Sequence, residues 1–225
     1  MICFGLDGYA KGWVAVRIEG DAHELKFFRD ITELLAQKFD RAFIDMPIGL
    51  PHSGERAADL AARAMLRPHA SRIFIGARRG LWDFASHAAA KRALWGRGEA
   101  GVSIELWHLG KKIRELDAAL TPRLQTKIRE AHPELIFLRL NGGMPLASKH
   151  TDEGVRLRHR LLRAHRFRSL DRWLREDRIG SGAKVDDILD ACALAIGARD
   201  CHPRRVLPRG RAPKDARELK MQIWY

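Results

Sequence analysis

The sequence predicts an α/β fold with a mixed sheet of about five strands flanked by helices. Three strand-like segments follow one another at the N-terminus, a short helix comes next, and a fourth strand follows it. A fifth strand is expected much later, and the last regular element is an apolar helix. Strands and helices in this order are typical of a mixed sheet covered by helices.

The first 46 residues contain the clearest strand patterns. A nearly continuous apolar run is typical of a strand covered on both faces, and strict alternation is typical of a half-buried one. Asp30 and Glu33 have the spacing of a helix capping box. We therefore expect strands at 2–6, 13–18, 24–28 and 41–46, a turn at 8–12, and a helix at 30–38.

The rest of the chain is expected to be mostly helical. Apolar residues recur at helical spacing over 102–120, Thr151 and Ser169 can cap helices, and 188–196 carries a core-facing stripe. A short strand is expected at 127–132, followed by a helix that starts at Pro133. This order matches the ribonuclease H-like fold, as a single domain over 1–225 with a mostly helical insertion at 52–120.

Composition and charge limit the class of protein. The chain has 225 residues, with 41 Lys plus Arg against 28 Asp plus Glu, a formal charge of +13. Such an excess favours a polyanionic partner, here nucleic acid, although Arg-rich solvated faces alone could also account for it. The N-terminus lacks a signal-peptide pattern, no apolar run is long enough for a membrane span, and three cysteines indicate no disulfide framework. We expect a cytoplasmic protein without membrane contact.

Four aspartates stand where acidic residues are normally excluded. Asp7 and Asp45 each end an apolar run, and Asp187 and Asp190 lie three apart in the closing helix. Carboxylates that converge from strand ends and a helix can share one or two divalent cations, as in two-metal phosphodiester cleavage. We therefore expect Mg²⁺ or Mn²⁺ as the cofactor.

Each of these aspartates also has a simpler explanation. Asp7 could begin an Asp-Gly turn, and the stretch from Asp7 to Trp13 could instead hold phosphate with backbone N–H groups and Lys11. Asp187 could only favour the helix N-terminus, but that explanation accounts poorly for Asp190.

Further candidates lie in loops and at helix starts. Glu134 is either a site carboxylate or a helix-start acid. Ser71, Arg72 and Lys149 are candidate phosphate contacts, although each could belong to a solvated basic loop. No metalloprotease, P-loop or dinucleotide-binding motif is present.

Several short motifs together resemble one family. They are Gly5–Gly8 with Lys11–Trp13, Asp45–Pro51, Ser71–Phe74, His132–Glu134, Asn141–Leu146, Ser148–Thr151, Asp186–Ala191 and Asp215–Tyr225. As a set they resemble a widespread prokaryotic family of unknown function described as predicted ribonuclease H-like nucleases. Tyr9 departs from the family, whose members often have Cys at that position.

The resemblance implies a metal-bound acidic cluster and a nuclease activity. Asp7, Asp45, Asp187 and Asp190 would be the metal ligands, and Glu134 would be a further catalytic residue. Lys11, Arg56, Ser71, Arg72 and Lys149 would contact the substrate. Two alternatives stay open, a nucleotide-binding phosphotransferase or ATPase of related fold and a non-catalytic nucleic-acid-binding module. The sequence also leaves the type of nucleic acid and the oligomeric state open, a homodimer included.

Overall fold

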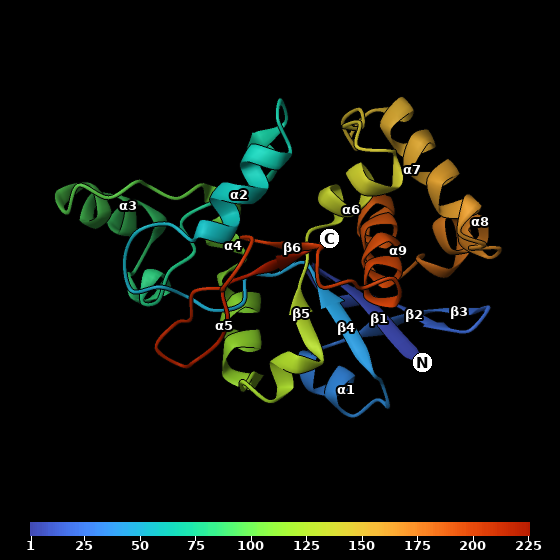
Figure 1. Ribbon diagram of the computed structural model, residues 1–225, viewed down its shortest axis with the longest axis horizontal. Coiled ribbons are helices and arrows are strands. Elements are labelled where there is room, and N and C mark those ends of the chain that lie inside the picture. Colours follow the sequence, from blue (N-terminus) through green and yellow to red (C-terminus); the bar gives the residue numbers. More distant parts are fainter. The chain divides into compact units, whose positions relative to one another are not determined.

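The computed structural model describes residues 1–225 and divides them into two compact units (Figure 1). The sheet unit comprises 1–46, 126–205 and 224–225. The second unit comprises 47–125 and 206–223 and contains the whole stretch expected as a helical insertion, 52–120. That all 225 residues make one domain stays a prediction. No helix combines the length and apolar character needed to cross a bilayer.

The sheet unit is built on a five-stranded mixed sheet in the order β3-β2-β1-β4-β5. The strands β1, β2 and β3 are antiparallel neighbours, whereas β4 is parallel to β1 and β5 is parallel to β4. The predicted α/β fold with a mixed sheet is confirmed, and the sheet is consistent with a ribonuclease H-like fold. The strands are β1 Ile2–Tyr9, β2 Gly12–Glu19, β3 Ala22–Phe28, β4 Arg41–Ile44 and β5 Ile128–Glu130.

The turn predicted over 8–12 is shorter in the structure and comprises residues 10 and 11, because β1 continues to Tyr9 and β2 begins at Gly12. Asp7 pairs with Val14 inside this hairpin, and only two residues remain for the turn. Gly12 is needed for packing, since a Cβ there would lie 2.0 Å from the carbonyl oxygen of Phe28. The hairpin leaves no loop long enough to surround a phosphate.

The helices of the sheet unit begin close to where capping residues predicted them. The Asp30 carboxylate accepts a hydrogen bond from the Thr32 N–H at 3.0 Å, and the Thr151 hydroxyl accepts one from the Gly154 N–H at 3.1 Å. Ser169 also stands at the N-cap position of the helical segment that follows it, but its side chain makes no capping hydrogen bond. The helices are α1 Ile31–Leu35, α6 Pro133–Leu140, α7 Asp152–Ala164, α8 Leu170–Arg172 with a π-helical turn at Trp173–Asp177, and α9 Val185–Arg199.

The closing helix α9 is buried on all sides between residues 188 and 198, rather than along one stripe. It packs on β1, β2 and β4, and also contacts α6 and α7 (Figure 1). Gly5 sets its distance from the sheet, because a Cβ on Gly5 would lie 2.1 Å from the Ala195 nitrogen and 2.2 Å from the Ala191 oxygen. The helix backbone therefore rests directly on the strand.

The second unit is mostly helical, and β6 in it pairs with β7, a two-residue strand that begins at Ile223, the last residue of this unit. The helix predicted over 102–120 is two helices, because the Trp82 indole donates to the Trp107 carbonyl at 3.0 Å and its ring contacts Gly110 at the break. The elements are α2 Ala57–Met65, α3 His87–Gly96, α4 Ile104–His108, α5 Gly110–Ala119, the 3₁₀ turns Ala70–Arg72, Leu81–Asp83 and Leu124–Thr126, β6 Val206–Leu207 and β7 Ile223–Trp224.

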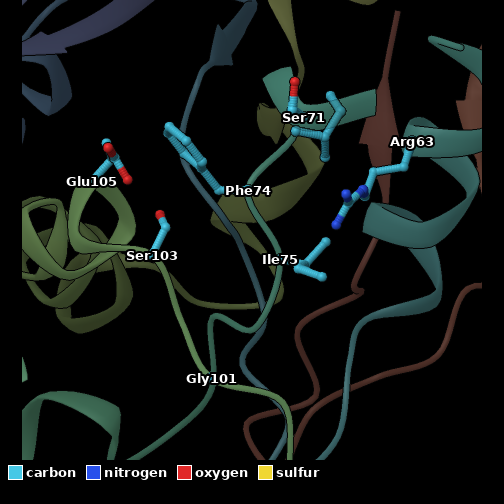
Figure 2. A pocket seen from close by; sticks show the side chains of 8 residues that line it. Arg63, Ser71, Phe74, Ile75, Gly101, Ser103 and Glu105 are labelled. Carbon is cyan, nitrogen blue, oxygen red and sulfur yellow. The ribbon is translucent and has the colours of Figure 1, made fainter. Parts of the chain in front are cut away.

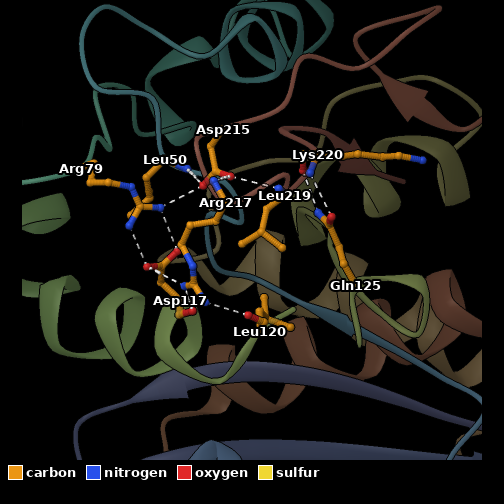
Figure 3. A network of polar contacts seen from close by, with 9 residues as sticks. All are labelled: Leu50, Arg79, Asp117, Leu120, Gln125, Asp215, Arg217, Leu219 and Lys220. Atoms are coloured by element: carbon orange, nitrogen blue, oxygen red, sulfur yellow. Dashed lines mark hydrogen bonds and ion pairs between the residues drawn. The ribbon is translucent and has the colours of Figure 1, made fainter. Parts of the chain in front are cut away.

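A buried carboxylate, Asp215, ties distant segments of the second unit together (Figure 3). It accepts hydrogen bonds from the N–H groups of Leu50 at 3.1 Å, Arg217 at 2.9 Å and Leu219 at 2.9 Å, and from the Arg79 guanidinium at 2.9 Å. Burial alone would raise the pKa of Asp215, but these donors favour its charged form and the net shift is downward.

We expect Gly5→Ala to lower the free energy of unfolding by about 3 kcal/mol or more, because its methyl group would collide with the α9 backbone. Gly96→Ala at the end of α3 is the matched control, since a Cβ there meets nothing within 4 Å. Urea unfolding followed by circular dichroism measures both. Equal stability of the two variants would contradict the close packing of α9 on β1.

We expect Asp215→Asn to cost about 3 kcal/mol of unfolding free energy at pH 7, because the amide cannot satisfy a ring of N–H donors. The carboxylate's lowered pKa makes its contribution complete above about pH 4, the ordinary value in an unfolded chain, and lost as pH falls through the lowered value. The free energies of unfolding of the wild-type protein and of Asp215→Asn, measured against pH, should therefore become equal in acid. Glu218→Gln, which removes an exposed ion pair with Lys214, should change stability by under about 0.5 kcal/mol.

Candidate functional site

The parallel strands of the sheet unit bring two of the predicted aspartates to one edge. Leu6 of β1 is the register partner of Ile44 of β4, so Asp7 and Asp45 follow partner residues on adjacent strands. The Asp45 N–H donates to the Leu6 carbonyl at 3.1 Å, which continues the ladder to this point. Ligand sites commonly form outside the carboxyl ends of parallel strands. The sheet therefore presents Asp7 and Asp45 together at such an edge.

Helix α9 supplies the other two aspartates. Asp190 comes directly before Ala191, whose carbonyl lies against Gly5 of β1, and only 1% of Asp190 is exposed. Asp187 lies one turn earlier and is half-buried. The close packing at Gly5 thus determines how near the helix carboxylates come to Asp7.

The other three aspartates lie close enough to Asp7 for their charges to act on it. Burial, and then the negative charges of Asp45, Asp190 and Asp187, raise the pKa of Asp7 well above its usual value. Burial also raises the pKa of Asp45, against the lowering effects of His132 and Lys149. The structure therefore brings together the four carboxylates that the sequence singled out.

Lys149 supplies a positive charge to this cluster. Its Nζ lies 2.7 Å from Asp190 Oδ2 and 3.3 Å from Asp186 Oδ2. Burial opposes its charge, but the pairing with Asp190 outweighs this and the net pKa of Lys149 is raised. Burial raises the pKa of Asp190 to about 6 despite Lys149 beside it. The sequence marked Lys149 as a phosphate contact and missed this pairing, because the two residues are 41 positions apart.

The loop that carries Lys149 is held rigidly. The Thr151 hydroxyl donates to the Ser148 carbonyl at 2.8 Å. Gly154 allows that carbonyl to approach helix α7, since a Cβ on Gly154 would lie 1.9 Å from the Ser148 oxygen. Lys149 is thereby positioned before any ligand arrives.

Glu134 lies beside the aspartates and pairs with a second cation, Arg158. Both side chains are buried, and Arg158 also donates to the carbonyls of Ala147 and Gly154 at 3.0 Å each. The charge of Glu134 raises the pKa of Asp45 and Asp190, so it belongs to the same site.

Sequence reasoning did not single out Arg158. The sequence contains only the four-residue spacing of Gly154, Arg158 and Leu162, and the structure shows that all three are buried on one face of α7. An arginine at that spacing among buried positions indicates an inward-facing guanidinium. The rest of the basic helix gave no reason to separate it from its neighbours.

No three His, Cys, Asp or Glu side chains are grouped so that they could hold a metal ion as they stand. Three of the carboxylates are engaged elsewhere, Asp190 with Lys149, Glu134 with Arg158, and Asp187 with the Lys184 N–H at 2.7 Å. The carboxylates of Asp7 and Asp45 take part in none of these bonds, and Asp190 Oδ1 is buried without a hydrogen-bond partner. These oxygens are the hard donors that Mg²⁺ and Mn²⁺ prefer.

The predicted substrate contacts fall in different places. Lys11 is exposed in the β1–β2 turn, and its side chain lies against Gly182, just before α9. Arg56, Ser71 and Arg72 belong to the second unit. Arg56 is buried with its guanidinium 3.5 Å from Asp59, which suits a structural ion pair better than an open phosphate contact. The substrate roles of all four stay predictions.

We expect Asp7→Asn to raise the free energy of unfolding by about 1 kcal/mol or more at pH 7 in EDTA. The substitution keeps the shape of the side chain and removes a charge that burial and three neighbouring carboxylates disfavour. Thermal unfolding measures the gain. Asp152→Asn is the control, because it removes an exposed aspartate from the favourable first turn of α7 and should give no gain. A destabilised Asp7→Asn protein would contradict the proximity of the four aspartates.

A protein-family model matches most of this chain. The family model described as "Protein of unknown function (DUF429)" matches residues 5–214. No curated protein and no solved structure matches the chain. The matched range contains Asp7, Asp45, Asp187 and Asp190, as well as Lys149. Since the match covers nearly the whole chain, this protein belongs to the DUF429 family.

Proposed function

We propose that the sheet unit is a metal-dependent nuclease that hydrolyses phosphodiester bonds in nucleic acid. One observation carries the proposal: Asp7 and Asp45 lie at the carboxyl edge of parallel strands, and Asp187 and Asp190 of α9 lie near them. The negative charges of Asp45, Asp187 and Asp190 raise the pKa of Asp7. A fold holds like charges together at such a cost mainly where a function requires them. The resemblance to predicted ribonuclease H-like nucleases supports the same reading.

The donor set fits Mg²⁺ or Mn²⁺ in its chemistry. Asp7, Asp45 and the unpartnered Oδ1 of Asp190 would hold the cation, with Asp187 completing the set. When bound, the cation would activate water and stabilise developing negative charge on the phosphate oxygens. Asp7 and Asp45 are only partly buried, so a substrate phosphate could approach them from solvent.

The surrounding residues position the carboxylates. Lys149 holds Asp190 through Oδ2, which leaves Oδ1 as its free acceptor. Arg158 holds Glu134 in the same way from the buried face of α7. These pairings restrict side-chain rotation, which favours a fixed arrangement when substrate binds. The formal charge of +13 supports a polyanionic substrate.

The second candidate is a non-catalytic nucleic-acid-binding module. It is favoured by Lys149, which already supplies a positive charge to the cluster without a metal ion. Such a module would bind nucleic acid tightly at low salt, lose affinity steeply as salt rises, and show no turnover. The two candidates therefore differ in one measurable property.

We expect the full-length protein to cleave labelled single-stranded or double-stranded DNA or RNA in Mg²⁺ or Mn²⁺, and not in EDTA. Asp7→Asn should lower the rate by more than the roughly 10- to 100-fold that loss of an outer ligand partner costs, because Asp7 would touch the cation directly. Gel resolution of the products measures the rate, and Asp152→Asn should cleave normally. Undiminished cleavage by Asp7→Asn rejects the assignment, and salt-sensitive binding without cleavage in either metal selects the binding module.

A further inference from the structure

A pocket of about 450 Å³ lies within the second unit, apart from the residues that carry the proposed nuclease (Figure 2). Its walls come from α2, from residues 71–75, and from residues 101–105 at the start of α4. The volume is in the range of about 300–1,000 Å³ that small-molecule sites occupy. We call it the α2–α4 pocket.

The pocket has opposite charges on opposite sides. Arg63 extends into it from α2, and its guanidinium forms no ion pair with a carboxylate. Glu105 lies across from it on α4, where its own N–H and the Ser103 hydroxyl lower the pKa of the carboxyl group. A ligand that fills this space meets a cation at one end and a hydrogen-bond acceptor at the other.

An aromatic ring lies between the two charges. Figure 2 shows Phe74 between the Glu105 side and the Arg63 side of the pocket. Phe74 is 42% exposed, although burying a phenyl ring against other apolar groups would be favourable. Ser71, near Arg63, adds an exposed hydroxyl. The ring offers a flat apolar surface on which a planar group can stack.

The walls are fixed before a ligand binds. The buried Arg78 donates from Nε to the Gly76 carbonyl at 3.1 Å and from Nη2 to the Ala100 carbonyl at 3.3 Å, and it pairs with Glu99. These bonds join the segment after Phe74 to the segment before Ser103. A Cβ on Gly76, whose φ is +93°, would also lie 2.9 Å from Val102 Cγ1, so the two segments pack closely. The backbone of these two segments is therefore held in place before a ligand binds, which lowers the entropic cost of binding.

We propose that the α2–α4 pocket binds a nucleoside monophosphate unit, with its base stacked on Phe74, its phosphate at Arg63 and Ser71, and its base edge at Glu105. Aromatic stacking and hydrogen bonds to the Watson–Crick edge are how proteins recognise unpaired bases. Guanine suits Glu105 best, because two neighbouring N–H donors of its edge can meet one carboxylate. Uracil offers that carboxylate a single N–H flanked by carbonyl oxygens.

Isothermal titration of the full-length protein with GMP, UMP and guanosine tests this assignment. GMP should bind at least about 10-fold tighter than UMP, the discrimination expected of a bidentate base contact. Arg63→Gln should weaken GMP about 10-fold or more and leave guanosine unchanged. Glu105→Gln should weaken GMP and leave UMP unchanged, and Phe74→Leu should weaken both nucleotides. Arg97→Gln and Glu55→Gln, which alter exposed charges outside the pocket, are the matched controls.

A second titration distinguishes two sources of the nucleotide, a nucleic-acid chain and a free nucleotide. A short oligonucleotide with a terminal guanosine that binds tighter than GMP identifies a nucleic-acid chain as the ligand, and equal affinity identifies the free nucleotide. GMP affinity that is absent at millimolar concentration, or unchanged in both Arg63→Gln and Glu105→Gln, overturns the proposal. Asp7→Asn should keep full GMP affinity, so failure of the nuclease assignment and failure of this pocket are distinguishable.

Discussion

The contact between α9 and β1 at Gly5 determines the architecture of the sheet unit. Because Gly5 has no side chain, the α9 backbone at Ala191 and Ala195 rests directly on the strand. A larger residue would push the helix outward by more than a packed core tolerates. The same contact sets the position of Asp190, which directly precedes Ala191, relative to Asp7 two residues beyond Gly5. The close approach of α9 to β1 at Gly5 is therefore required both for the fold and for the candidate site.

The candidate site disfavours the charged forms of its carboxylates. Burial and mutual repulsion disfavour the charged form of Asp7, and the same causes act on Asp45 and Asp190. Lys149 and Arg158 reduce this cost without removing it, since each pairs with only part of the carboxylate set. Sites that keep unfavourable charges in place are characteristic of function rather than stability. The carboxylates that remain free of partners are the ones that could accept a cation or a substrate.

The two units present different chemistry. The sheet unit concentrates negative charge at a strand edge, with its nearest cations already paired. The second unit places an unpaired arginine and an exposed phenyl ring in one pocket, and it is held together by the buried carboxylate of Asp215. Each unit thus has its own structural anchor and its own candidate ligand chemistry. A nuclease and a nucleotide pocket in one chain would both recognise phosphate-bearing molecules.

The sequence by itself determined the α/β class, most strand positions and the caps at Asp30 and Thr151, because apolar periodicity and capping are local properties. It also singled out the four aspartates as candidate site residues. It did not reveal that β1 reaches Tyr9, which depends on pairing with β2, or that Trp82 accompanies the break between α4 and α5. The partners of Lys149 and Glu134 were also beyond it, because residues 24 to 41 positions apart meet only when the chain packs. Local sequence patterns indicate which residues are candidates for the site. Only tertiary packing determines which charged side chains pair with one another.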